Sequence, residues 1–180
     1  IDSFRQHMFD VQYNPSPNPH DAQQLLGYLE SHPWDAASVI WTLNFDLTPV
    51  YAISVASPYA IDVGKTLQKF LAEQISGKVE RVSIPGLTGS RVRLMTGEEL
   101  PVIFPELRGM YSWDTSGLVR SVLGDPPPDD CATDVKQKYQ QKMLGIRKFL
   151  DRVYYESRNL GQTSRDRAIN YSATNAFQIE

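Results

Sequence analysis

The chain has 180 residues, of which 41% are hydrophobic and 22% charged, and its formal net charge is −3. These values are ordinary for a globular protein of one domain, or one domain with an appendage, and they exclude disorder as a description of the whole chain. A membrane protein is also excluded, because no apolar run approaches the roughly 20 residues that a spanning helix needs. The single cysteine rules out an intramolecular disulfide framework and favours a reducing compartment, so we expect a cytoplasmic protein.

The ends and the charge distribution set further expectations. The chain begins at Ile1 and stops at Glu180 without an initiator methionine or a signal-peptide pattern, so we expect a fragment of a longer protein. From Asp134 onward there are nine Lys and Arg against five Asp and Glu, a charge of +4, whereas the preceding residues total −7. The basic end is more typical of a solvated helix face, or of a surface complementary to an acidic neighbour, than of a nucleic-acid footprint. Because the acidic remainder would repel phosphates, we expect no nucleic-acid partner.

The first half of the chain predicts an arm, a helix and a hairpin. Residues 1–19 form the arm, because the Pro-rich spacer that ends it cannot sustain a helix. A short helix with leucines on one face is expected over residues 20–31. Two β-branched and aromatic runs, residues 38–45 and 50–56, flank a turn at residues 46–49 and predict a central antiparallel hairpin.

A second helix and further strands follow. Ser57 and Pro58 suit the start of a helix, and Gly77 is typical of its C-terminal end. The Gly-rich residues 86–90 lack the Gly-Lys-Ser/Thr ending of a phosphate-binding loop, and we interpret them as a β-turn. Three strands and a short helix are expected at residues 78–84, 90–95, 100–104 and 115–123.

The last third predicts helices alone. Residues 125–132 form a Pro-rich linker, and long helices at 135–159 and 165–177 then make a helical hairpin within residues 133–180. The longer helix carries a coiled-coil-like stripe, formed by Tyr139, Met143, Ile146, Leu150 and Val153. An apolar stripe needs a cover, so the hairpin packs either on the rest of the chain or on a second copy, and we expect a homodimer.

Together these elements predict an α+β fold: an antiparallel sheet with flanking helices, residues 20–124, followed by the C-terminal helical hairpin. No catalytic signature accompanies it. There is no Gly-x-Ser-x-Gly elbow, and the Asp-Thr-Ser-Gly run at residues 114–117 is better interpreted as a helix cap than as an aspartic-protease motif. We therefore assign no catalytic residue.

Two kinds of binding residue stand out. His20, His32 and Cys131 are of the types that zinc prefers, although no local ligand spacing supports a site; the alternative is surface or capped histidines and an incidental thiol. No other cofactor is expected. Arg91 and Arg93 share one strand face and could clamp a peptide carboxylate, or instead pair with Glu80, Glu98 or Glu99.

Trp34 completes the predicted peptide-binding residues. It follows His32 and Pro33 and precedes Asp35, and we expect its indole to be partly exposed. Exposed aromatic side chains are enriched in protein interfaces, so Trp34 with Arg91 and Arg93 could line a peptide-binding surface.

Residues 32–53 resemble a known family. An apolar strand, Ile-Trp-Thr-Leu-Asn at 40–44, leads through a short acidic turn into a second strand, Val-Tyr-Ala-Ile at 50–53. This pattern resembles the C-terminal domain of unknown function of the cyanobactin maturation proteins, the PatA/PatG type, and is most similar to the patellamide macrocyclase branch. The helix around Gly64 and the segment 102–104 are also similar.

The resemblance implies a context more than a mechanism. Proteins of this family carry a separate subtilisin-like domain that cleaves or macrocyclises ribosomal precursor peptides, and its motifs are absent here, so no catalytic residue carries over. The implied function is that of a non-catalytic accessory domain, assisting by dimerisation, enzyme docking or precursor-peptide binding. Its partners would be the attached protease domain, the precursor peptide or other pathway enzymes. The alternatives are an uncharacterised peptide-modifying enzyme domain and a zinc-stabilised binding module.

Overall fold

The computed structural model describes residues 18, 21–156 and 161–175, with side chains through residue 154 and over residues 161–172. The predicted arm, apart from Asn18, and the candidate ligand His20 lie outside the described residues. The chain divides into two compact units, residues 1–112 and 113–180. The short helix expected at 115–123 thus belongs to the helical unit, whereas the expected boundary after residue 124 groups it with the sheet.

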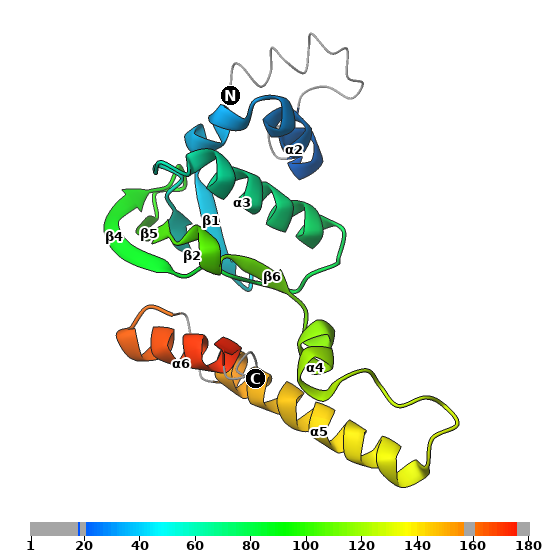
Figure 1. The fold of residues 1–180 in the computed structure, drawn as a ribbon. Helices are drawn as coiled ribbons and strands as arrows, with labels where there is room; N and C mark the ends of the chain where they lie inside the picture. The colour runs from blue at the N-terminus through cyan, green and yellow to red at the C-terminus, as the bar shows by residue number, and fades with distance from the viewer. Residues whose placement is uncertain (1–17, 19–20, 157–160, 176–180) are drawn as a thin grey trace. The chain divides into compact units, whose positions relative to one another are not determined.

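A four-stranded sheet forms the centre of the first unit. Its strands are β1 (Trp41–Phe45), β2 (Thr48–Ile53), β4 (Gly86–Arg93) and β5 (Glu99–Pro105), in the order β1-β2-β5-β4 (Figure 1). The predicted β1–β2 hairpin is confirmed, and β4 also runs antiparallel to β5. The central pair β2 and β5 is parallel, through Ala52 beside Val102 and Ile53 beside Ile103. The sheet is therefore mixed, although mostly antiparallel as predicted.

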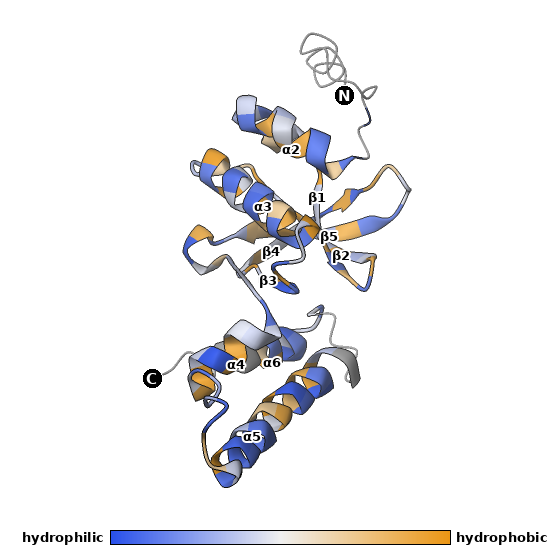
Figure 2. Ribbon diagram, turned by 90° about the vertical axis from the view of Figure 1, so that its right-hand side faces the viewer, coloured by the Kyte–Doolittle hydropathy of each residue, from blue (hydrophilic) through white to orange (hydrophobic). Residues whose placement is uncertain are grey.

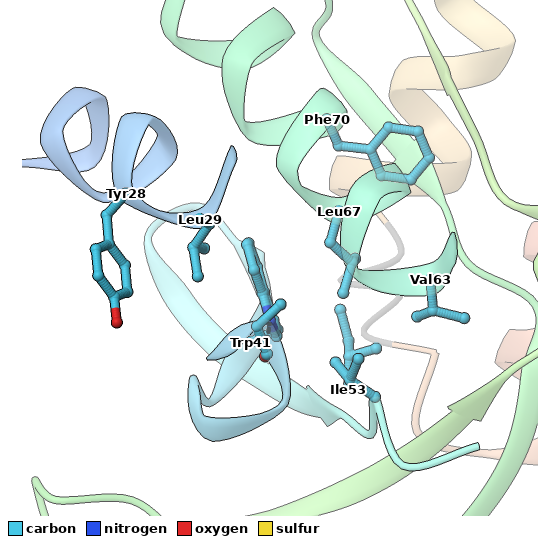
Figure 3. Packing of buried hydrophobic residues seen from close by; sticks show 9 residues of the cluster. Tyr28, Leu29, Trp41, Ile53, Val63, Leu67 and Phe70 are labelled. Carbon is cyan, nitrogen blue, oxygen red and sulfur yellow. Dashed lines mark hydrogen bonds between the residues drawn. The ribbon is translucent and has the colours of Figure 1, made fainter. Parts of the chain in front are cut away.

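Helices cover the sheet and close the core. They are α2 (Ala22–Ser31), the 3-10 helix η1 (Pro33–Ser38) and α3 (Ala60–Ile75). α3 contributes Val63, Leu67 and Phe70 to one buried cluster with Trp41 and Ile53 of the sheet, and α2 adds its own apolar side chains (Figure 3). Removing these surfaces from water is the main stabilising term of the unit, about 25 cal/mol per Å² of apolar area.

The ends of α3 show where the sequence prediction holds. At the C-terminus Gly77 has φ +67°, its N–H donates to Gln74 O at 3.1 Å, and Lys78 N–H donates to Glu73 O at 2.9 Å. This is the glycine-terminated cap expected from Gly77. At the N-terminus the helix begins at Ala60 instead of Pro58, because Ser57 Oγ accepts the N–H of Tyr59 at 3.1 Å and holds a separate turn.

The β-turn predicted at residues 86–90 is wrong, since β4 begins at Gly86. The glycines there permit close packing in place of a turn. A Cβ on Gly86 would lie 2.3 Å from the carbonyl oxygen of Phe104, and one on Gly89 would lie 2.2 Å from the Phe104 ring. The strand needs glycine because β5 approaches it closely, which local sequence does not reveal.

Gly86→Ala is expected to lower the free energy of unfolding by about 1–3 kcal/mol, because the methyl group forces β4 away from the backbone of β5. Gly27→Ala is the matched control: a Cβ at this position in α2 meets nothing within 4 Å. That variant should gain about 0.5–1 kcal/mol, since alanine favours helix over glycine. Urea unfolding of both variants checks the signs, and a Gly86→Ala protein as stable as the parent would contradict the close approach.

Short elements complete the first unit and lead into the second. β3 (Arg81–Ser83) pairs with β6 (Tyr111–Trp113), and the 3-10 helix η2 (Leu107–Gly109) precedes β6. The sequence predicts β3 but not β6, η1 or η2. Such pieces have too few residues to show a hydrophobic period.

The second unit is helical. Its elements are α4 (Thr115–Leu123), α5 (Thr133–Asp151), the π-helical turn η3 (Arg152–Glu156) and α6 (Ser164–Asn175). Asp114 caps α4 by accepting the N–H of Gly117, as predicted, and α4 ends at Gly124 with φ +76°. α5 packs against α4, and Tyr139 Oη donates to Gly124 O at 3.0 Å. Among the described residues, no helix combines the length and apolar character needed to cross a membrane.

Candidate functional site

The junction between α2 and η1 brings together a tyrosine, a histidine, a tryptophan and an aspartate. We call the four residues Tyr28, His32, Trp34 and Asp35 the α2–η1 junction. Its local structure follows from Pro33, which disfavours helical backbone at the residue before it and suits the first position of a new helix. α2 accordingly stops at Ser31, His32 takes φ −128° and ψ 62°, and η1 begins at Pro33.

His32 is held against the end of α2. Its backbone N–H donates to Tyr28 O at 3.0 Å, and its ring Nδ1 lies 3.1 Å from the same oxygen. Because a carbonyl only accepts, Nδ1 is the donor in that contact. The imidazole also stacks on the Tyr28 ring, with centroids 4.5 Å apart and planes at 11°.

η1 is fixed on both sides of Trp34. The Tyr28 hydroxyl donates to Asp35 Oδ2, which ties η1 back to α2. Trp41 Nε1 donates to Ala36 O at 2.9 Å, and a Cβ on Gly64 would lie 3.0 Å from that of Ala36, so η1 also packs closely on α3. These contacts hold the backbone of Trp34 in place before any ligand arrives, which lowers the entropic cost of binding.

Trp34 projects from this platform, with 72% of its surface exposed. The exposure agrees with the sequence expectation. Its neighbours are acidic: Glu30 and Asp35 lie nearby in the chain, and neither α2 nor η1 contains a lysine or arginine. An exposed indole beside carboxylates suits an apolar side chain or a cationic one, because a cation is attracted both to the ring face and to the acids.

The other peptide-binding candidates lie on a different element. Arg91 and Arg93 are exposed on β4, at the edge of the sheet farthest from β1, whereas η1 packs on α2 and α3. Arg91 is engaged: its Nε lies 3.8 Å from Glu99 Oε2 and its Nη2 donates to Glu99 O at 2.8 Å. The pairing with Glu99 is one of the alternatives that the sequence left open, and the peptide-binding role of Arg91 and Arg93 stays a prediction.

The zinc candidates are not assembled into a site by the described residues. His32 belongs to the first unit and takes part in the stacking described above, Cys131 lies half-buried in the second unit, and His20 is outside the described residues. Over the part of the chain that the structure describes, no group of three His, Cys, Asp or Glu side chains could hold a metal ion. The zinc-stabilised module stays a prediction.

Most of the predicted dimerisation stripe lies on the inner side of α5, and its last member, Val153, lies on the π-helical turn η3. Leu150 and Val153 are buried, and Tyr139, Met143 and Ile146 are half-buried. In this arrangement the stripe is at least partly covered within a single copy of the chain. The homodimer itself stays a prediction.

Tyr28 has no role in the sequence predictions, and His32 is predicted there as a zinc ligand and not as a stacking partner. Tyr28 and His32 are spaced i, i+4, which places them on one face of a helix, and that spacing signals their stacking. The hydrogen bond from Tyr28 to Asp35 has no such signal, because it depends on the backbone conformation of His32, between the two helices.

The architecture is that of an α+β domain, with a mostly antiparallel four-stranded sheet, flanking helices and a C-terminal helical unit. Residues 136–180, which include most of α5 and all of α6, match the family model described as PatG C-terminal. A solved structure named PatG Domain of Unknown Function is 35% identical to the chain, with a TM-score of 0.72. These matches show that the chain is similar to the PatG C-terminal domain of unknown function, which confirms the resemblance seen in the sequence.

The extent of the two matches differs. The solved structure matches over 96% of this chain, and the chain spans 64% of the length of that structure. The family model, in contrast, covers the helical C-terminus and leaves out the hairpin on which the sequence resemblance rested. A search of curated proteins found no match.

Proposed function

We propose that the chain is a non-catalytic accessory domain of a protease or macrocyclase that matures ribosomal cyclic peptides of the cyanobactin class, and that it binds a segment of the precursor peptide at Trp34. The observation that carries the proposal is the exposed indole on a rigid support. The proposed pathway rests on the family resemblance, and the proposed binding surface rests on the α2–η1 junction.

The expected peptide follows from the surroundings of the indole. An apolar side chain covering much of Trp34 would contribute about 2–4 kcal/mol, the range found for aromatic hot spots. An adjacent Lys or Arg in the peptide would face Asp35 and Glu30. Neither α2 nor η1 contains a lysine or arginine that could pair with these carboxylates. The preferred segment therefore pairs an apolar residue with a basic one.

Isothermal titration against the full precursor peptide, its leaderless form and its core-only form tests the proposal. We expect micromolar binding to at least one form, and Trp34→Ala should weaken it about tenfold or more. Because the indole is exposed, the same substitution should change the free energy of unfolding by less than about 0.5 kcal/mol.

Tyr59→Ala provides the matched control. Tyr59 is another exposed aromatic of the first unit, 64% accessible at the start of α3, and its loss should leave peptide affinity unchanged. Absence of binding to all three peptide forms, or an equal loss from both substitutions, would count against a site at Trp34.

A further inference from the structure

The strand β4 (Gly86–Arg93) forms one edge of the sheet, and its outer side is open. β4 is the last strand in the order β1-β2-β5-β4, and among the described residues β5 is its only partner (Figure 1). Every residue of β4 except Val92 is exposed, so the strand is largely uncovered on both faces as well as along its edge. An open edge leaves a row of backbone N–H and C=O groups that another strand can bind.

Hydrogen bonds at the two ends of the β4–β5 pair show which backbone groups face outward. In an antiparallel pair, residues opposite each other alternate between exchanging hydrogen bonds and directing their backbone groups away from each other. Leu94 N–H donates to Glu98 O at 2.7 Å, so this pair is of the bonded kind. The next pair, Arg93 and Glu99, is therefore of the open kind, and Arg91, two residues further, has the same orientation. The N–H and C=O groups of both arginines point away from β5.

Thr88 has the same orientation at the other end of β4. It lies opposite Ile103, whose C=O accepts the N–H of Ser54 at 2.8 Å on the β2 side of β5. Because both backbone groups of a strand residue point to one side, those of Ile103 face β2 and those of Thr88 face outward. Among the described residues, none outside the sheet bonds to the backbone of Thr88, Arg91 or Arg93. The edge thus offers the N–H and C=O groups of these three residues to another strand.

One face of the edge is apolar. The strand register sets Leu87 opposite Phe104, so both side chains lie on the same face, where Leu87 is 79% exposed and Phe104 45% exposed. The Phe104 ring lies over Gly89 of β4, at which a Cβ would come within 2.2 Å of the ring. Figure 2 shows hydrophobic residues beside hydrophilic ones on this pair of strands. Alternate side chains of a strand added outside β4 would therefore lie beside Leu87 and the Phe104 ring.

The other face of the edge carries charge. Arg91 and Arg93 lie opposite Pro101 and Glu99, whose side chains are on the other face of β5 from that of Phe104. Arg91 is held by Glu99, as described above, whereas the Arg93 side chain has no ion pair or hydrogen bond with the described residues. β4 itself contains no Asp or Glu. A carboxylate on an added strand would therefore meet a guanidinium at Arg93 that the described chain leaves without a counter-charge.

We propose that β4 binds an extended segment of a partner protein by strand addition, so that the segment becomes a fifth strand of the sheet. Its backbone bonds to the outward groups of β4, an apolar side chain packs on Leu87, and a carboxylate pairs with Arg93. This surface is separate from Trp34, because β4 lies at the edge of the sheet farthest from β1, whereas η1 packs on α2 and α3. A single added strand buries less than a standard interface, and the register shift between Thr88 and Arg91 interrupts regular pairing, so the complex is transient.

An extended acidic segment fits this edge better than a helix or a second copy of the chain. A helix satisfies its backbone groups internally and leaves none for β4. A second β4 strand would add two arginines and no carboxylate, whereas an acidic segment neutralises Arg93. Self-association of the chain is therefore the competing outcome of the test.

The probe is a short synthetic peptide in which valines alternate with threonines and a glutamate replaces one threonine, labelled for fluorescence anisotropy with the full chain. We expect micromolar binding. Arg93→Glu should weaken the binding about tenfold, and a peptide with lysine in place of the glutamate should restore the affinity of that variant. Lys65→Glu makes the same change of charge on the exposed side of α3 and should bind the peptide like the parent.

Backbone pairing is tested separately from the side chains. Successive residues of a strand direct their N–H groups to opposite edges, so N-methylation of one alternate set of peptide residues should abolish binding, while methylation of the other set leaves it largely intact. Thr88→Pro removes an outward N–H that β5 does not use, and it should weaken binding severalfold with a urea midpoint close to that of the parent. The methylated peptides are measured with the parent protein, so their result does not depend on the folding of a variant.

Three results would overturn the proposal: no binding of the peptide by the parent, an equal effect of the two methylated peptides, or a loss of affinity in Lys65→Glu. Sedimentation of the parent over a range of concentrations covers the competing occupant. Self-association that Thr88→Pro abolishes, together with no binding of the peptide, would assign the edge to a second copy of the chain.

Discussion

Leu150→Asp is expected to unfold the helical unit, residues 113–180. The Leu150 side chain is 3% exposed on the inner side of α5, so the substitution removes buried apolar area and places a carboxylate where water cannot solvate it. The combined cost is about 3–5 kcal/mol, a large share of the stability of a small domain. Far-UV circular dichroism should show a loss of helix, and hydrogen exchange should accelerate through α4 and α5.

Leu144→Asp is the control on the same helix, because Leu144 faces outward and is half exposed. It should retain the helical signal and stability of the parent to within about 0.5 kcal/mol. The pair also tests the homodimer hypothesis. Sedimentation of the parent and of Leu150→Asp compares their oligomeric states. If the parent is a dimer and the variant a folded monomer, the stripe is a contact between copies, and its burial within one chain is not essential for folding.

Leu29→Ala should be the most damaging conservative change in the first unit. Leu29 lies on α2, is 1% exposed and belongs to the cluster shared with α3 and the sheet. Truncation leaves a cavity among side chains from three elements, and such changes cost about 2–5 kcal/mol. Thermal or urea unfolding measures the loss.

Leu26→Ala, on the same helix, separates burial from helix composition. Leu26 is half-buried and lies outside the core cluster, so its truncation should cost clearly less. Equal losses at both positions would mean that α2 is not anchored through Leu29. Leu29→Ala should also weaken peptide binding at Trp34, since η1 is tied to α2 through Tyr28 and Asp35.

Elements whose signals are local were predictable from the sequence. α4 spans Thr115–Leu123, as expected, because Asp114 caps one end and Gly124 closes the other. The β1–β2 hairpin follows from two β-rich runs around a short turn. The exposure of Trp34 is also predictable from its neighbours in the sequence, since the residue lies between Pro33 and Asp35 in a short helical turn.

Features that depend on distant residues were not predictable. Gly86 and Gly89 look like turn residues until Phe104 is seen to pack on them. The junction needs the Tyr28 hydroxyl and Asp35 to meet across the break between α2 and η1, which neither hydrophobic periodicity nor motif spacing encodes.

The parallel pairing of β2 with β5 constrains the order in which the sheet can assemble. Ile53 lies beside Ile103, and Ser54 N–H donates to Ile103 O at 2.8 Å, so the central ladder joins residues fifty positions apart in sequence. Closing so long a loop costs entropy before any contact is gained, and folding rates fall as such contacts increase. During synthesis, one edge of β2 therefore stays unpaired until β5 has left the ribosome. That interval is the stage at which this chain is most exposed to aggregation and to chaperone capture.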